Sequence, residues 1–180
     1  MNRIASFILL ISMGSLLIIG CGPKETKEQL SARATDFESN ENFKEAIVVY
    51  EQLIKDYPNT DAADSILFRI GQMYSNNLLE FDNAINAHKR LVKKYPESRF
   101  SAQSLFMIGY HYANSISDTV EAKNYYGKFL EQYPEHELAN SVRWELDHLG
   151  QDINEIDFLK SEMFEESEQD SGVSNPKNTN

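Results

Sequence analysis

The chain of 180 residues is poor in several residue types, and each shortage excludes a class of structure or function. It has one cysteine, Cys21, so no disulfide can form within one chain and no cysteine-based zinc site can be built. Basic residues are also scarce, with 17 Lys and Arg against 28 Asp and Glu and a formal net charge of -11 at pH 7. So acidic a protein lacks the basic face that phosphates require, and we expect no nucleic-acid partner.

The motifs that usually mark an enzyme are missing as well. There is no G-x-S-x-G, no Walker loop and no G-x-G-x-x-G. His136-Glu137 begins like the zinc motif HExxH, but Asn140 stands in place of the second histidine. The many carboxylates fall mostly on faces that we expect to be exposed. We therefore predict a non-catalytic protein with no metal site and no cofactor.

The apolar run of the chain lies at its N-terminus. Arg3 precedes residues 4–19, which are apolar apart from a few small residues, a pattern typical of a secretory signal. The alternatives are an uncleaved membrane-spanning helix and a buried structural cysteine. Ile18-Ile19-Gly20-Cys21 resembles the bacterial lipobox. The resemblance implies cleavage before Cys21 and a lipid anchor of three acyl chains on it, and Gly22 implies sorting to the outer membrane of a two-membrane envelope.

An internal repeat dominates the rest of the chain. Tyr-Pro pairs recur at a constant interval, and an alanine stands at the same distance before each proline. The pairs begin at Tyr57, Tyr95 and Tyr133, and the alanines are Ala46, Ala84 and Ala122. A fixed period of this size is typical of a helical repeat array. We predict an all-α fold of stacked helix pairs in one domain, an architecture that usually binds other proteins.

Each repeat is expected to contain two closely packed helices. The first helix carries apolar and small residues on one face, at Leu67, Ile70, Gly71 and Tyr74 and again at Leu105, Ile108, Gly109 and Tyr112. The two glycines have no side chain, so the second helix of the pair can approach closely there. The alanine at each matching phase serves the same purpose on the second helix.

The ends of these helices also have signals. Each proline is expected to end the second helix, because it has no N–H to donate and restricts the residue before it. Thr60 and Ser98 are suited to cap the first helix that follows. Asp118 with Glu121 is typical of a capping box.

The repeat resembles the tetratricopeptide repeat (TPR), whose spacing is L-x-x-L-G-x-x-Y followed by alanine, an aromatic residue, a small residue and proline. Two full copies match, and a partial first copy has Ala34 at the glycine position and Phe37 at the tyrosine position. The period is longer than the usual TPR period of about 34 residues, with one extra residue expected in the turns before Ala84 and Ala122. The resemblance implies an α-solenoid of about three TPR helix pairs plus a C-terminal capping helix. An ordinary helical bundle is the alternative.

The resulting organisation has five parts. Residues 1–21 form the signal, 22–26 a spacer, 27–150 the TPR domain, 151–160 a short capping segment and 161–180 an acidic tail that we expect to be disordered. The capping helix is expected at about 137–149, with Trp144 used for packing rather than for binding.

The resemblance also places a binding surface. In the TPR family, the first helices of successive pairs line the concave surface. Carried over to this chain, the groove residues are Phe68, Gln72 and Asn76 in the second repeat and Phe106, Tyr110 and Asn114 in the third. Aromatic and amide side chains suit a protein or peptide partner. The alternative is that Phe68 and Phe106 complete the core between repeats.

A basic cluster stands on the second helix of the second repeat, at Lys89, Arg90, Lys93 and Lys94. It could be a docking patch for an acidic partner, but we favour a solvated helix face.

The lipobox, the repeat array and the Tyr-Pro turns together resemble the BamD family of outer-membrane assembly lipoproteins. The resemblance implies a membrane-anchored scaffold at the periplasmic face of the outer membrane, although members usually have about five repeats. The alternatives are a periplasmic TPR protein that coordinates cell division or cell-wall synthesis, and a generic peptide-binding adaptor of the envelope.

Overall fold

The structure is a computed structural model and describes residues 24–151. The signal, Cys21, Gly22 and the segments from residue 152 onward lie outside the described residues, and what we expect of them stays a prediction. The elements are α1 (Lys27–Ser39), α2 (Phe43–Asp56), α3 (Ala63–Gln72), η1 (Met73–Leu78), α4 (Phe81–Lys94), α5 (Ser101–His111), η2 (Tyr112–Ile116), α6 (Thr119–Gln132) and α7 (Ala139–Asp147).

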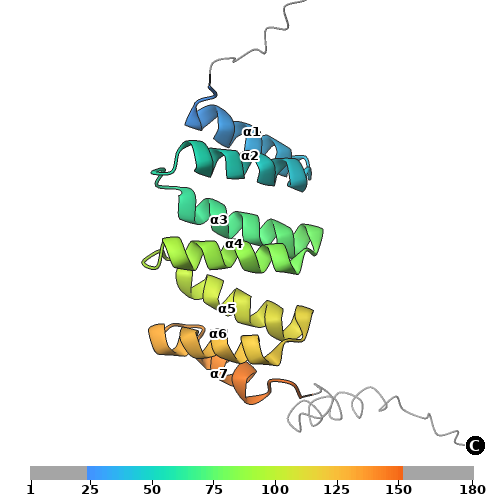
Figure 1. The fold of residues 1–180 in the computed structure, drawn as a ribbon, viewed down its shortest axis with the longest axis vertical. Helices are drawn as coiled ribbons and strands as arrows, with labels where there is room; N and C mark the ends of the chain where they lie inside the picture. The colour runs from blue at the N-terminus through green and yellow to red at the C-terminus, as the bar shows by residue number, and fades with distance from the viewer. Residues whose placement is uncertain (1–23, 152–180) are drawn as a thin grey trace, which may run out of the picture.

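The helices stack in chain order as antiparallel neighbours, from α1 at one end of the array to α7 at the other (Figure 1). The pairs α1–α2, α3–α4 and α5–α6 each pack along their length, and α4 also packs on α5. Helix α7 lies against α6 and covers the end of the array. No strand occurs between residues 24 and 151. The predicted all-α solenoid of three helix pairs and a capping helix is confirmed.

The Tyr-Pro pairs end the second helices, as predicted. Tyr57, Tyr95 and Tyr133 are the C-caps of α2, α4 and α6, with φ between -129 and -132°. The N–H of each tyrosine still donates to the carbonyl of the residue four positions earlier. The following proline cannot continue the ladder, so the helix stops there.

The prediction that Thr60 and Ser98 cap the next helices is wrong. The N-caps are Ala62 and Phe100, and neither caps with its side chain. Two successive turns follow each proline, the second closed from Thr60 to Ala63 and from Ser98 to Ser101, and they delay the helix start by two residues. Ser98 is used elsewhere, because its hydroxyl donates to Asp64 at 2.6 Å and ties two repeats together.

The extra residue of the second and third repeats lies inside the first helix rather than in the turn after it. The spacing from Gly71 to Ala84, and from Gly109 to Ala122, is one residue longer than the spacing from Ala34 to Ala46 in the first repeat. The two longer repeats end their first helices in the π-helical turns η1 and η2, and α1 has none. A π turn absorbs one inserted residue without breaking the helix. Leu79 and Ser117 then reverse the chain with φ of 55° and 63°.

The two glycines allow close packing within a pair, as predicted. A Cβ added to Gly71 would lie 2.6 Å from the ring of His88, and one added to Gly109 would lie 2.6 Å from the ring of Tyr126. Both rings are fully buried. The aromatic residue of the second helix therefore occupies the space that a glycine side chain leaves empty.

The capping signals are partly confirmed. The Asp118 carboxylate accepts from the Glu121 N–H at 3.0 Å and so caps α6. A full capping box occurs at Thr26 and Gln29, where each side chain accepts from the other's backbone N–H. It starts α1 at Lys27, the start that we expected for the domain.

The basic cluster of α4 is divided between two roles. Arg90 donates to both carboxylate oxygens of Glu51 on α2, the second of these bonds being 2.8 Å long. Lys89 donates to the Tyr112 hydroxyl at 2.7 Å and lies 5.2 Å from the centre of the Tyr125 ring. These two residues connect neighbouring repeats, and Arg90 also keeps half of its side chain exposed to solvent. Lys93 and Lys94 are exposed.

Candidate peptide-binding groove

The candidate site lies along the first helices of the pairs, α1, α3, α5 and α7. Two hollows occur between successive first helices, one at each end of the array. The N-terminal hollow lies between α1 and α3, and the C-terminal hollow lies between α7 and the segment formed by α5 and η2. Both are open to solvent, so their lining residues could reach a partner that runs along the first helices.

The N-terminal hollow has a volume of about 570 Å³ and is lined mainly by polar residues. At its floor, Arg69 donates to the Tyr50 hydroxyl at 3.2 Å and pairs with Glu38 at 3.3 Å. The Tyr50 hydroxyl in turn donates to Glu38 at 3.0 Å. Because Glu38 already neutralises Arg69, Arg69 is not a free cation for a ligand carboxylate.

The C-terminal hollow has a volume of about 330 Å³. Its lining residues are Tyr110, Ala113, Asn114, Trp144, Glu145, His148, Leu149, Gly150 and Gln151. The Trp144 ring stacks on His148, with ring centres 4.4 Å apart, and 43% of Trp144 remains exposed. The hollow therefore combines apolar faces with amide and carboxylate groups, the mixture that usually orients a bound peptide.

The six predicted groove residues are only partly brought together. Tyr110 and Asn114 line the C-terminal hollow, and the Asn114 amide donates to the Tyr110 carbonyl at 3.2 Å. Gln72 and Asn76 are exposed but line neither hollow. Asn76 and Asn114 lie in the π turns, where the α-helical spacing that linked each to its stripe no longer holds.

The two phenylalanines of the predicted groove lie deeper than the other four residues. Phe68 is only 7% exposed and stacks on Phe100 with ring centres 4.9 Å apart, so it belongs to the core. Phe106 is half-buried and packs 6.2 Å from the centre of the Tyr126 ring. Phe68 is therefore unavailable to a ligand, in agreement with the alternative of core packing.

A comparison with known protein families supports the same layout. The family described as Tetratricopeptide repeat matches residues 33–60, 65–98 and 103–136, which together make up more than half of the chain. The chain belongs to the tetratricopeptide repeat family. Each TPR match begins in a first helix and ends after the Tyr-Pro pair of the same repeat. No curated protein sequence matches the chain closely enough to give a named relative. TPR proteins are generally non-catalytic scaffolds that bind other proteins.

Trp144, which the sequence analysis expected to serve packing, stacks on His148 and also lines the C-terminal hollow. Positions 68, 106 and 144 are equivalent in successive repeats, so Trp144 is the third member of one aromatic series after Phe68 and Phe106. In the two complete TPR units, the ring of the second helix, His88 or Tyr126, lies against the phenylalanine. The position equivalent to these rings after Trp144 is 164, outside the described residues. The repeat period itself could have placed Trp144 in the groove.

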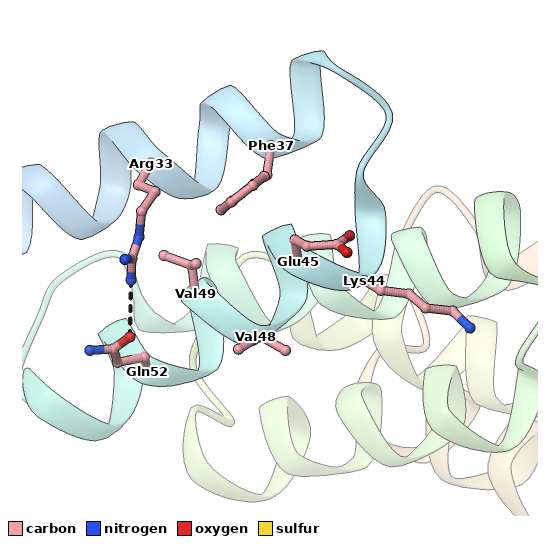
Figure 2. A pocket seen from close by; sticks show the side chains of 7 residues that line it. All are labelled: Arg33, Phe37, Lys44, Glu45, Val48, Val49 and Gln52. Carbon is pink, nitrogen blue, oxygen red and sulfur yellow. Dashed lines mark hydrogen bonds between the residues drawn. The ribbon is translucent and has the colours of Figure 1, made fainter.

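A further hollow lies at the N-terminal end of the TPR array, on the other side of α1 and α2 (Figure 2). It has a volume of about 340 Å³, and Arg33 donates across it to Gln52 at 3.1 Å. Gln52 occupies the position in the first repeat that Arg90 occupies in the second, and Arg90 bonds to the preceding repeat. This hollow is therefore the end face that a preceding repeat would cover, and it is separate from the groove.

Two buried histidines lie between the second and third TPR units and serve packing. His88 is fully buried, and its Nδ1 lies 3.1 Å from the Ser104 hydroxyl. Burial, helped by the nearby His111, lowers the pKa of His88 to about 3, and burial also lowers the pKa of His111. Both rings are therefore neutral at pH 7, and neither reaches a hollow that could hold a substrate.

The described residues also bear on metals and membranes. Between residues 24 and 151, no three His, Cys, Asp or Glu side chains come together as a metal site would need. In the same part of the chain, none of the helices is long and apolar enough to cross a bilayer.

Proposed function

We propose that this TPR protein is a non-catalytic scaffold that holds a partner protein along its first helices while a lipid on Cys21 anchors it to the bacterial envelope. The observation that carries the first half is the C-terminal hollow. Two large aromatic side chains, Tyr110 and Trp144, are 39% and 43% exposed at its rim. Aromatic residues are enriched at the centres of protein interfaces, where their burial contributes most of the binding energy.

The second half of the proposal comes from the lipobox. Cys21 stands six residues before the first residue of α1. At about 3.5 Å per residue, an extended linker of this length reaches only about 20 Å. A lipid on Cys21 would therefore keep the TPR array close to the membrane surface. Tethering raises the local concentration of the array near other envelope proteins, so a groove of modest affinity is sufficient.

The cellular role that we propose is the assembly of outer-membrane proteins at the periplasmic face of the outer membrane. Its support is the combined resemblance of the lipobox, the array and the Tyr-Pro turns to the BamD family. Periplasmic TPR proteins that coordinate cell division or wall synthesis resemble this chain only in the Tyr-Pro turns. We treat that role as an alternative outcome of the test.

The test of partner binding compares groove variants in the native envelope. The double variant Tyr110→Ala/Trp144→Ala should lose chemical crosslinks to its partner by at least about tenfold, as expected for interface aromatic residues. Val120→Ala is the matched control, because Val120 is 77% exposed and lies on α6, away from both groove hollows. Both proteins should keep the same far-UV circular dichroism.

The identity of the adducts separates the cellular roles. Subunits of the barrel-insertion machinery support outer-membrane assembly, and septal wall enzymes support the alternative. Equal crosslinking by a folded double variant and the wild type would contradict the groove. Anchoring is tested separately with Cys21→Ser, which should abolish incorporation of labelled palmitate and release the protein from membranes.

A further inference from the structure

The C-terminal hollow has a charge character that the N-terminal hollow lacks. Its lining contains one carboxylate, Glu145, and neither lysine nor arginine. The N-terminal hollow is lined by both signs of charge, and its Arg69 is paired with Glu38. An acidic group among aromatic faces therefore distinguishes the C-terminal end of the groove.

The Glu145 carboxylate has bonding capacity left. Between residues 24 and 151 it forms no salt bridge, and the hydrogen bond that it accepts there comes from the Tyr126 hydroxyl at a long 3.4 Å. Burial and the nearby Glu145 raise the pKa of that hydroxyl, so Tyr126 stays protonated and acts as a donor. A carboxylate has room for several donors, so among the contacts of residues 24–151 Glu145 keeps capacity for a ligand.

The aromatic faces favour the same kind of ligand group as the carboxylate does. A cation placed over the face of Trp or Tyr is attracted by the ring quadrupole, most strongly for Trp. The guanidinium of arginine is planar, so it can stack on a ring and still donate two parallel hydrogen bonds to a carboxylate. Trp144 and Glu145 are neighbours in α7 and line the same hollow as Tyr110.

We propose that the C-terminal hollow receives an arginine side chain of the partner, stacked on Tyr110 or on the face of Trp144 opposite His148, and hydrogen-bonded to Glu145. This inference rests on the proposed function, in which the first helices hold a partner segment, and it adds the chemistry of one position of that segment. Asn114 and Gln151 line the hollow beside these residues, and their amide oxygens can accept the remaining guanidinium N–H groups.

The charge of this chain argues that the arginine comes from another protein. The formal net charge of -11 disfavours association with a second copy. The chain's own acidic tail, with Glu162, Glu165 and Glu168, complements an acidic hollow poorly, whereas the predicted capping segment 151–160 is the competing occupant that the quenching experiment below detects. A basic segment of a different partner fits both the hollow and the overall charge.

The test uses Trp144 as its own reporter, because it is the only tryptophan of the chain. The full chain is titrated with four acetylated, amidated pentapeptides, and tryptophan fluorescence is recorded. The peptides differ in one residue between two leucines, which is arginine, lysine, citrulline or glutamate. Citrulline has the shape of arginine without its charge. The arginine peptide should bind about tenfold more tightly than the citrulline peptide, the sum expected for a cation–π contact and a charge-assisted pair.

Variants assign the effect to Glu145. Glu145→Gln should remove the preference for arginine over citrulline, whereas Glu131→Gln, an exposed position on α6, should preserve it. Equal binding of arginine and citrulline, or an unchanged preference in Glu145→Gln, overturns the arginine site while leaving the groove function intact. Tighter binding of lysine than of arginine overturns the stacked guanidinium. No response to any peptide, with crosslinks still lost in the groove double variant, overturns the arginine site alone.

Acrylamide quenching before peptide addition checks for other occupants. The exposure of Trp144 predicts efficient quenching of the free chain. A shielded indole at every protein concentration would show the chain's own segment in the hollow, and shielding that rises with concentration would show a second copy. Either result overturns the proposal.

Discussion

Replacing Gly109 by alanine should destabilise the array although alanine is the better helix former. The added Cβ would lie 2.6 Å from both Cδ1 and Cε1 of Tyr126, closer than carbon atoms can pack. Tyr126 is fully buried and lies between α5 and α7, so its ring has little freedom to move away. One of the two helices must shift.

The size of the effect follows from two opposing terms. Overpacking a rigid site costs about 3 kcal/mol at the upper end of its usual range. The higher helix propensity of alanine offsets about 1 kcal/mol. We expect Gly109→Ala to lower the free energy of unfolding by about 2 kcal/mol, the difference between these terms.

The chain contains its own control at Gly127, in the middle of α6. A Cβ added there would meet no atom within 4 Å, so only the propensity term applies. Gly127→Ala should raise the free energy of unfolding by about 1 kcal/mol. Urea unfolding followed by far-UV circular dichroism measures both variants. A stabilised Gly109→Ala protein would refute the reasoning that the glycine exists for the approach of Tyr126.

Three further predictions concern pH, ion pairing and backbone strain. His88 has a folded pKa of about 3 against an ordinary 6.5, so the stability of the protein should fall as the pH drops from about 6.5 towards 3. Tyrosine stands at the equivalent positions 50 and 126, and His88→Tyr should make the urea midpoint depend less on pH across that window. An unchanged pH dependence would contradict the assignment. Arg90 and Glu51 are half-exposed, so a double-mutant cycle should give a coupling of at most about 1 kcal/mol that weakens in concentrated salt, and salt-independent coupling would indicate a different interaction. Leu79 is 66% exposed and has a φ of 55°, a conformation that glycine adopts more easily than leucine. Leu79→Gly should therefore raise the free energy of unfolding by up to about 1 kcal/mol and raise the thermal midpoint with it. A lowered midpoint would show that the leucine side chain contributes packing.

The fixed repeat period predicted most of the fold. It placed the helix pairs, the Tyr-Pro ends and the contacts of Gly71 and Gly109, because each of these depends on residue types at fixed spacing within one repeat. The π turns were harder to foresee. The longer spacing from glycine to alanine in the second and third repeats showed that one residue was extra. A longer turn and a π bulge can both accommodate one extra residue, and the sequence does not distinguish between them.

The contacts between repeats could not be predicted from the sequence. Arg90 bonds to Glu51 of the preceding repeat, and Lys89 bonds to Tyr112 of the following one. The charge pattern of one helix does not reveal such partners, because the distance between repeats depends on how the array twists. The same limit applies to Trp144, because its phase matches that of Phe68 and Phe106 but phase alone does not give the exposure of a side chain.

The central claim is that a partner protein lies along the first helices at the C-terminal hollow. Its most direct measurement is photo-crosslinking in the intact envelope, with a photoreactive amino acid replacing Trp144 in one strain and Asn86, an exposed residue of α4, in another. The account predicts a discrete protein adduct from position 144 and none from position 86. Adducts of the same protein in equal yield from both positions, or from position 86 alone, would contradict it.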